Sequence, residues 1–106
     1  MSSFSPGDIV VKTPNPTNPT IYNLTASLAA TEYNHVVAAG TLYFKISARG
    51  LSTLKLSFTS GQSGTVYVTI PSGSKWCSPN LSGTASLTIY FQTTKSNEVV
   101  EVEEWT

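Results

Sequence analysis

The chain has 106 residues, in which six lysines and arginines balance six acidic residues, and it contains one His and one Cys. This length suits one domain with a single core, and a lone cysteine cannot form an internal disulfide. The neutral balance excludes the clustered cations of a nucleic-acid-binding protein, and no apolar run is long enough to span a membrane. The first residues also lack the basic and apolar regions of a signal peptide, so we expect synthesis in a cytoplasm.

Residues 1–20 differ from the rest of the chain in composition. They contain four of the six prolines and the run TPNPTNPT, which favours an extended, polyproline-like backbone. We expect an N-terminal arm here, not a core strand. Within the arm, Asp8–Lys12 is a short β-favouring run that could add to a sheet edge or dock on a neighbouring subunit. The arm's candidate interface residues are Phe4, Ile9, Val10 and Val11.

From residue 20 onward, apolar and polar residues alternate with a period of two, which is typical of half-buried strands. The clear candidates are residues 41–49, 53–59, 65–70, 86–92 and 98–105. Residues 21–28 and 32–37 are weaker candidates, and residues 24–33 could instead form a short helical turn. The apolar side chains expected to face the core are Leu42, Phe44, Ile46, Ala48, Leu54, Leu56, Phe58, Val66, Val68, Ile70, Leu87, Ile89, Phe91, Val100 and Val102.

Turn signals separate these segments at intervals of roughly ten residues. They lie at residues 39–40, 49–50, 60–64, 71–83 and 93–97. Short strands at this spacing, without a helical crossover, predict an all-β fold. We expect an antiparallel β-sandwich or jelly roll of about seven to eight short strands in residues 21–106, preceded by the Pro-rich arm.

Few residues could carry out catalysis. His35, Cys77 and Asp8 are each the only residue of their kind, and a catalytic triad would have to recruit them from distant segments. We expect His35 to be an exposed or hydrogen-bonded residue at a strand end, and Cys77 to be a small half-buried hydrophobe. No spacing of ligands suggests zinc, so we expect neither an enzyme nor a metal or other cofactor.

Four of the five glutamates lie in the last nine residues. Alternation places Glu98 and Glu104 on the face of Val100 and Val102, and it places Glu101, Glu103 and Trp105 on the opposite face. Glu101 and Glu103 could pair on a divalent cation, but calcium needs more oxygen ligands. A solvated terminal strand whose charges block edge pairing is the simpler interpretation. The acidic strand could also face a basic neighbour, for which the candidates are Lys45, Arg49 and Lys55.

Four aromatic residues are predicted to lie on outward faces. Such residues stabilise a sheet as a cross-strand ladder, form a protein interface, or provide a surface on which sugars stack. We treat them as interface candidates, together with the apolar residues of the arm. They are Tyr43, Tyr67, Tyr90 and Trp105.

Residues 31–106 contain the stretches TEYNHVVAAGTLYFKISARG, TLKLSFTSGQSGTVYVTIPSG and LTIYFQTTKSNEVVEVEEWT. The pattern of strand residues in these stretches resembles that of small all-β virion proteins of tailed bacteriophages, in particular head decoration or cement proteins. The resemblance implies a structural protein on the capsid surface of the virion that binds the major capsid protein, cements adjacent capsomers and often acts as a trimer. The alternative function is a carbohydrate-binding or host-adsorption module of a phage tail or spike.

Overall fold

The computed structural model describes residues 19–81 and 85–106, which form an all-β structure of eight antiparallel strands. Neither range contains a helix, and therefore neither contains one that could cross a membrane. The strands are β1 (Pro19–Ala26), β2 (Tyr33–Val37), β3 (Tyr43–Ala48), β4 (Leu54–Ser57), β5 (Val68–Ile70), β6 (Lys75–Cys77), β7 (Leu87–Thr93) and β8 (Glu98–Trp105).

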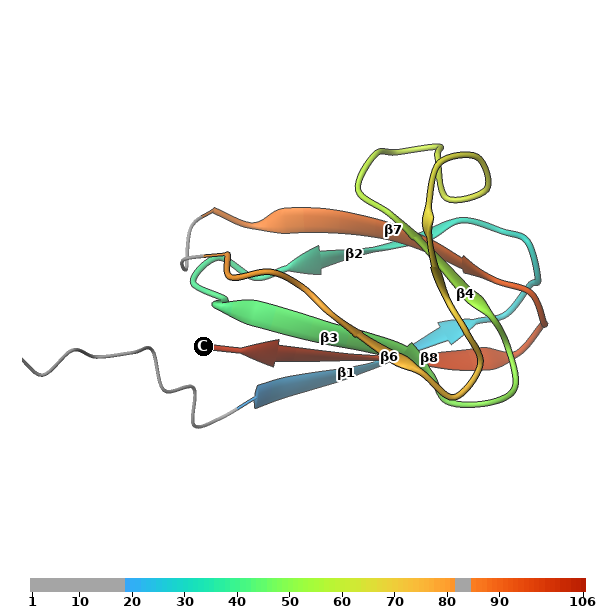
Figure 1. The fold of residues 1–106 in the computed structure, drawn as a ribbon, viewed down its shortest axis with the longest axis horizontal. Helices are drawn as coiled ribbons and strands as arrows, with labels where there is room; N and C mark the ends of the chain where they lie inside the picture. Colours follow the sequence, from blue (N-terminus) through green and yellow to red (C-terminus); the bar gives the residue numbers. More distant parts are fainter. Residues whose placement is uncertain (1–18, 82–84) are drawn as a thin grey trace, which may run out of the picture.

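The strands form two four-stranded sheets that pack face to face (Figure 1). One sheet has the order β1-β8-β3-β6 and is called the β8 sheet below; the other has the order β2-β7-β4-β5 and is called the β7 sheet. The chain passes from one sheet to the other at every connection except that between β4 and β5. Eight antiparallel strands in this order are the topology of a jelly roll, which confirms the predicted fold class.

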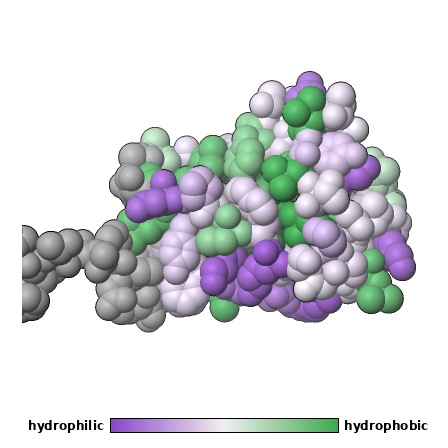
Figure 2. Space-filling model, in the orientation of Figure 1, coloured by the Kyte–Doolittle hydropathy of each residue, from purple (hydrophilic) through white to green (hydrophobic). Residues whose placement is uncertain are grey.

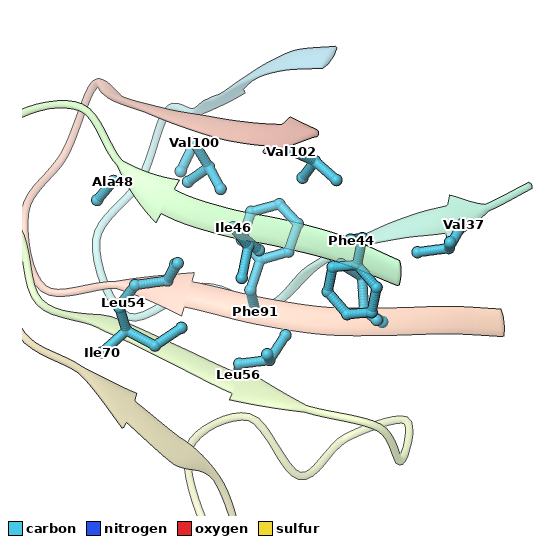
Figure 3. Close-up of a cluster of buried hydrophobic side chains, with 12 residues drawn as sticks. Val37, Phe44, Ile46, Ala48, Leu54, Leu56, Ile70, Phe91, Val100 and Val102 are labelled. Atoms are coloured by element: carbon cyan, nitrogen blue, oxygen red, sulfur yellow. The ribbon is translucent and has the colours of Figure 1, made fainter. Parts of the chain in front are cut away.

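The core lies between the sheets and is built from the alternating apolar residues of both (Figure 3). Phe44 and Ile46 project from β3, Val100 and Val102 from β8, and Phe91 from β7. All five side chains are almost completely buried. Because each strand buries only every second residue, the outer faces of both sheets remain free for polar and aromatic side chains.

Three residues predicted to face the core lie at the surface instead, and one of them, Val68, is the first residue of β5. Phe58 follows the last residue of β4 and is 42% exposed, and Val66 precedes β5 and is 70% exposed. Residues 58–67 form a loop that projects from the sandwich (Figure 1). The alternation of the sequence continues past the strand ends, whereas the hydrogen bonds of the sheet do not.

Three further predictions about elements need correction. The turn expected over residues 71–83 contains a strand, β6, which pairs with β3 after a tight turn in which Gly73 has a φ of 81°. The helical turn considered for residues 24–33 is absent, because β1 continues to Ala26. Pro19 and Thr20, assigned to the arm, are the first residues of β1, and residues 1–18 lie outside the described residues.

β8 is an interior strand, paired with β1 on one side and β3 on the other. The interpretation of β8 as a solvated strand that blocks edge pairing is therefore wrong. Glu98 and Glu104 are buried along with Val100 and Val102, as their shared face requires. Glu98 accepts a hydrogen bond from the Gly50 amide, so its carboxylate fastens the β3–β4 connection.

Candidate functional site

A buried hydrogen bond between a histidine and a glutamate joins the two sheets. The Nε2 atom of His35 on β2 lies 2.6 Å from Oε2 of Glu104 on β8, and the Glu104 side chain is only 2% exposed. The other carboxylate oxygen of Glu104 accepts a hydrogen bond from the Ala38 amide at 3.2 Å. His35 is therefore hydrogen-bonded, which was one of the two alternatives predicted for it, and it connects the two sheets.

The Tyr22 ring also packs against His35, with ring centroids 4.6 Å apart. These contacts leave His35 enclosed by side chains of the β8 sheet, Glu104 and Tyr22, and neither is a nucleophile of the serine or cysteine kind. We call His35 and Glu104 a structural clamp, because the buried carboxyl group of Glu104 on β8 is hydrogen-bonded to a side chain of β2 in the other sheet.

Ion pairs cover the outer face of the β8 sheet. Arg49 Nε lies 2.7 Å from Oε2 of Glu101 and also donates to Asn23, and Lys75 Nζ lies 2.6 Å from Oε2 of Glu103. The Lys75 ammonium holds the pKa of the Glu103 carboxyl below its ordinary value. The basic neighbour predicted for the acidic strand is therefore confirmed for Arg49.

Lys45 also faces the acidic strand, as predicted: it is paired in register with Glu103, its charge helps to lower the pKa of that carboxyl, and its ammonium lies over the Trp105 ring. Lys55 differs from the prediction, because it lies on β4 in the opposite sheet, where its ammonium is 4.8 Å from the centroid of the Tyr67 ring. Lys75, which sequence reasoning missed, belongs to the unpredicted strand β6. Among the described residues, no group of three or more His, Cys, Asp or Glu side chains could hold a metal ion.

Trp105 and Tyr43 form an aromatic pair at one end of the same outer face. Their rings stack with centroids 6.0 Å apart and an angle of 15° between planes, and Lys45 Nζ lies 5.9 Å from the indole centroid. The carbonyl of Trp105 accepts a hydrogen bond from the Leu42 amide at 2.7 Å, which fixes the end of β8. Trp105 points away from Val100 and Val102, as alternation predicts.

The four aromatic candidates do not form one surface. Tyr43 and Trp105 lie on the outer face of the β8 sheet, whereas Tyr90 points outward from β7 and Tyr67 precedes β5 in the other sheet. The arm candidates Phe4, Ile9, Val10 and Val11 lie outside the described residues. Cys77, expected to be half-buried, is exposed because it lies on the outer face of the edge strand β6.

An exposed apolar segment lies at the β4–β5 connection. We call Phe58, Val66, Tyr67 and Val68 the β4–β5 patch; each is a large side chain that remains exposed. In Figure 2 hydrophobic residues reach the surface of the loop that projects from the sandwich. Such residues on a projecting loop commonly contact a partner.

The loop that carries the patch is held by one carboxylate. Glu32 accepts hydrogen bonds from the Ser63 hydroxyl at 2.6 Å, the Gly61 amide at 2.8 Å and the Ser63 amide at 3.0 Å. The Ser63 hydroxyl and then the two amides lower the pKa of Glu32 from the ordinary value of 4.5. When Glu32 is ionised, its hydrogen bonds therefore hold in place the loop that carries the β4–β5 patch.

This arrangement predicts an acid-sensitive loop. Because the folded-state pKa of Glu32 is below its unfolded value, its contribution is complete above pH 4.5 and is lost as the pH falls through the folded pKa. We expect hydrogen-exchange protection factors of the Gly61 and Ser63 amides to fall between pH 6 and pH 3. Glu32→Gln should show the lower protection at both pH values, and equal protection in the variant and the parent at pH 6 would contradict the assignment.

No family model matches the chain, and no curated protein matches it. Among solved structures, it is similar to a de novo designed double-stranded β-helix whose structure was determined by solution NMR. The sequences are 18% identical, the TM-score is 0.52, and the match covers 85% of this chain and 100% of the designed chain. At this identity the similarity shows the fold alone.

Proposed function

We propose that this protein is a non-enzymatic structural component of a tailed-phage virion that binds the outer capsid surface and cements adjacent capsomers. The observation that carries the proposal is the placement of two contact regions. β1 begins at one end of the molecule, and the loop of the β4–β5 patch projects nearer the other end (Figure 1). A small domain with contact regions at separate ends can connect two neighbouring subunits of a lattice.

The rest of the structure supports this role. The sandwich contains no disulfide among its described residues, β8 is paired on both sides within its sheet, and the buried His35–Glu104 hydrogen bond joins the two sheets. The outer face of the β8 sheet is covered by paired charges, which contribute little net affinity for a partner. Contacts with the major capsid protein, and any trimer, would then rest on the arm, the β4–β5 patch and the outward aromatics.

The alternative function, a carbohydrate-binding or host-adsorption module of a tail or spike, has one feature in its favour. A shallow pocket of about 240 Å³ is lined by Ser47, Arg49, Ser74, Lys75 and Glu101, whose groups can hydrogen-bond a sugar. No aromatic ring lines this pocket, and the three tyrosines lie on two different sheets. The geometry therefore favours the capsid role.

The test is whether the protein copurifies with intact particles, and at what ratio to the major capsid protein. A ratio corresponding to hundreds of copies per particle would support decoration of the lattice. A handful of copies would support a tail or vertex location and with it the adsorption module, and absence from particles would overturn both.

A second prediction concerns the arm. Deletion of residues 2–18 leaves every described strand intact, so we expect the melting temperature to change by only a few degrees while attachment to particles is lost. Thermal melting and cosedimentation with particles measure the two effects. Leu51→Ser, which alters an exposed residue outside both contact regions, is the control and should leave melting and attachment unchanged. Loss of folding on deletion would show that the arm is part of a sheet.

A further inference from the structure

The shallow pocket on the outer face of the β8 sheet lies over a short side chain between two long ones. Ser47 on β3 pairs in register with Lys75 on β6 and with Glu101 on β8, so these side chains form one row across the face. Gly73 and Ser74, in the turn before β6, complete the wall. The volume of about 240 Å³ is below the roughly 300–1,000 Å³ of sites for drug-sized ligands, so the pocket suits a molecule of monosaccharide size.

Ion pairs hold two cations at the rim of the pocket. Lys75 reaches Glu103 in the next row of the face, and its Nζ atom lies 2.6 Å from Oε2 of that carboxylate. Arg49 donates to Glu101 and to Asn23, which are paired in register on β8 and β1. Both cations also line the pocket. Their positions are therefore fixed by partners beside the pocket, and the space over Ser47 is not filled by them.

The ion pairs leave most donors of the two cations unused. A guanidinium has five N–H donors and an ammonium has three. Among the described residues, the side-chain hydrogen bonds use two donors of Arg49 and one donor of Lys75. The hydroxyls of Ser47 and Ser74 also line the pocket, and a hydroxyl both donates and accepts. The pocket therefore has more donors than its own carboxylate satisfies.

The charges of the pocket favour a ligand with a single negative charge. Two cations, Arg49 and Lys75, line it together with one carboxylate, Glu101. A guanidinium binds both carboxylates and phosphates. A phosphate monoester carries nearly two negative charges at neutral pH, so Glu101 repels it more strongly than it repels a carboxylate. A carboxylate is therefore the better fit.

The other polar groups favour a ligand that also carries hydroxyls. A carboxylate has about four acceptor positions, and Arg49 uses one oxygen of Glu101. Glu101 and the two serines can therefore bind ligand hydroxyls next to the cations. None of the described residues that line the pocket is aromatic, so a neutral sugar would have neither a ring to stack on nor a charge to pair with.

We infer that the pocket binds a hydroxylated monocarboxylate of monosaccharide size, such as a hexuronate. The ligand carboxylate lies between Arg49 and Lys75, and the ligand hydroxyls bond to Glu101, Ser47 and Ser74. Because the site is open to water and its cations are already paired, we expect a dissociation constant on the order of 1 mM. The inference does not rest on the proposed virion role, since binding is a property of the free protein and is compatible with a capsid or a tail location.

The test is titration of the full-length ¹⁵N-labelled protein with sodium D-glucuronate at constant ionic strength, followed by NMR. We expect saturable shifts of the amide resonances of Ser47, Ser74 and Lys75 and of the Arg49 Nε–H resonance. Glucose has the same ring without the carboxylate, and glucose 1-phosphate replaces the carboxylate by a phosphate. Both should bind at least about tenfold more weakly than glucuronate.

Two substitutions locate the site. Lys75→Met removes the ammonium but keeps most of the length of the side chain, and it should weaken glucuronate binding at least about fivefold. Ser47→Val replaces the hydroxyl at the base of the pocket by a methyl group and should also weaken binding. Lys55→Met, the same substitution on the opposite sheet, is the matched control and should leave binding unchanged. Circular dichroism confirms that each variant is folded.

Four results would overturn the proposal. The first is the absence of saturable shifts at about 50 mM glucuronate, far above the expected dissociation constant. The second is equal binding of glucose, which would make the pocket a site for neutral sugars. The third is equal or tighter binding of glucose 1-phosphate, which would make it a general anion site. The fourth is unchanged glucuronate binding in Lys75→Met, which would place the ligand elsewhere.

Discussion

Replacing His35 with alanine is expected to remove about 3–5 kcal/mol from the free energy of unfolding at neutral pH. The substitution leaves the Glu104 carboxyl group buried between the sheets, where it keeps the hydrogen bond from the Ala38 amide but loses that with His35. It also removes the packing of the Tyr22 ring on the imidazole. Since small domains are stable by about 5–15 kcal/mol, the loss is a large fraction of the total. Urea unfolding measures it.

Two variants distinguish the stability lost by leaving Glu104 without its partner from the stability lost when any side-chain contact is removed. Arg49→Ala breaks the exposed pair with Glu101, and it should cost less than about 1 kcal/mol because water screens that pair. The double variant His35→Leu/Glu104→Leu removes both buried polar groups, and it should recover much of the stability that His35→Ala loses. The assignment of His35 as a clamp fails if His35→Ala costs no more than Arg49→Ala.

The second large effect is expected in the core. Phe91 is 1% exposed in the middle of β7, where it packs against the Tyr33 ring. Phe91→Ala removes this burial and leaves a cavity, so we expect a loss of about 3–5 kcal/mol. Phe58→Ala is the matched control, because the same substitution at an exposed site should cost about 1 kcal/mol or less.

Both phenylalanines were predicted to face the core, which makes the comparison a test of the fold. The midpoint of urea unfolding should move for Phe91→Ala while the slope m stays that of the parent. Similar losses in the two variants would mean that Phe58 is buried and that the loop is packed differently.

Alternation of apolar and polar residues predicts features of a single strand, such as which of its side chains face the core. Phe44 and Ile46 face inward because they lie two residues apart in an extended segment, and the same parity sends Trp105 outward. The spacing of the turns predicts a sandwich or jelly roll. None of these signals identifies which strands are neighbours, and the position of β8 between β1 and β3 could not be predicted.

The candidate site was predictable in part. Parity had already placed Glu98 and Glu104 on the face of the core valines, which was the signal that they are buried. Parity alone does not predict how a carboxyl group inside a sandwich is satisfied, because the partners, His35 and the Gly50 amide, lie far away in the sequence. Glu32 was missed for the same reason, since its carboxylate binds a loop that begins more than 20 residues later.

The interior position of β8 has a consequence for how the chain folds during synthesis. The sheet that contains β1 and β3 cannot close until the last strand, Glu98–Trp105, is inserted between them. β8 follows β1 and β3 in the chain, so all three strands must be synthesised before that sheet can form. Pairing of the first strand with the last also gives a high contact order, which is typical of slow folding. Loss of the C-terminal residues, for example from a premature stop codon, would leave β1 unpaired and the sandwich open.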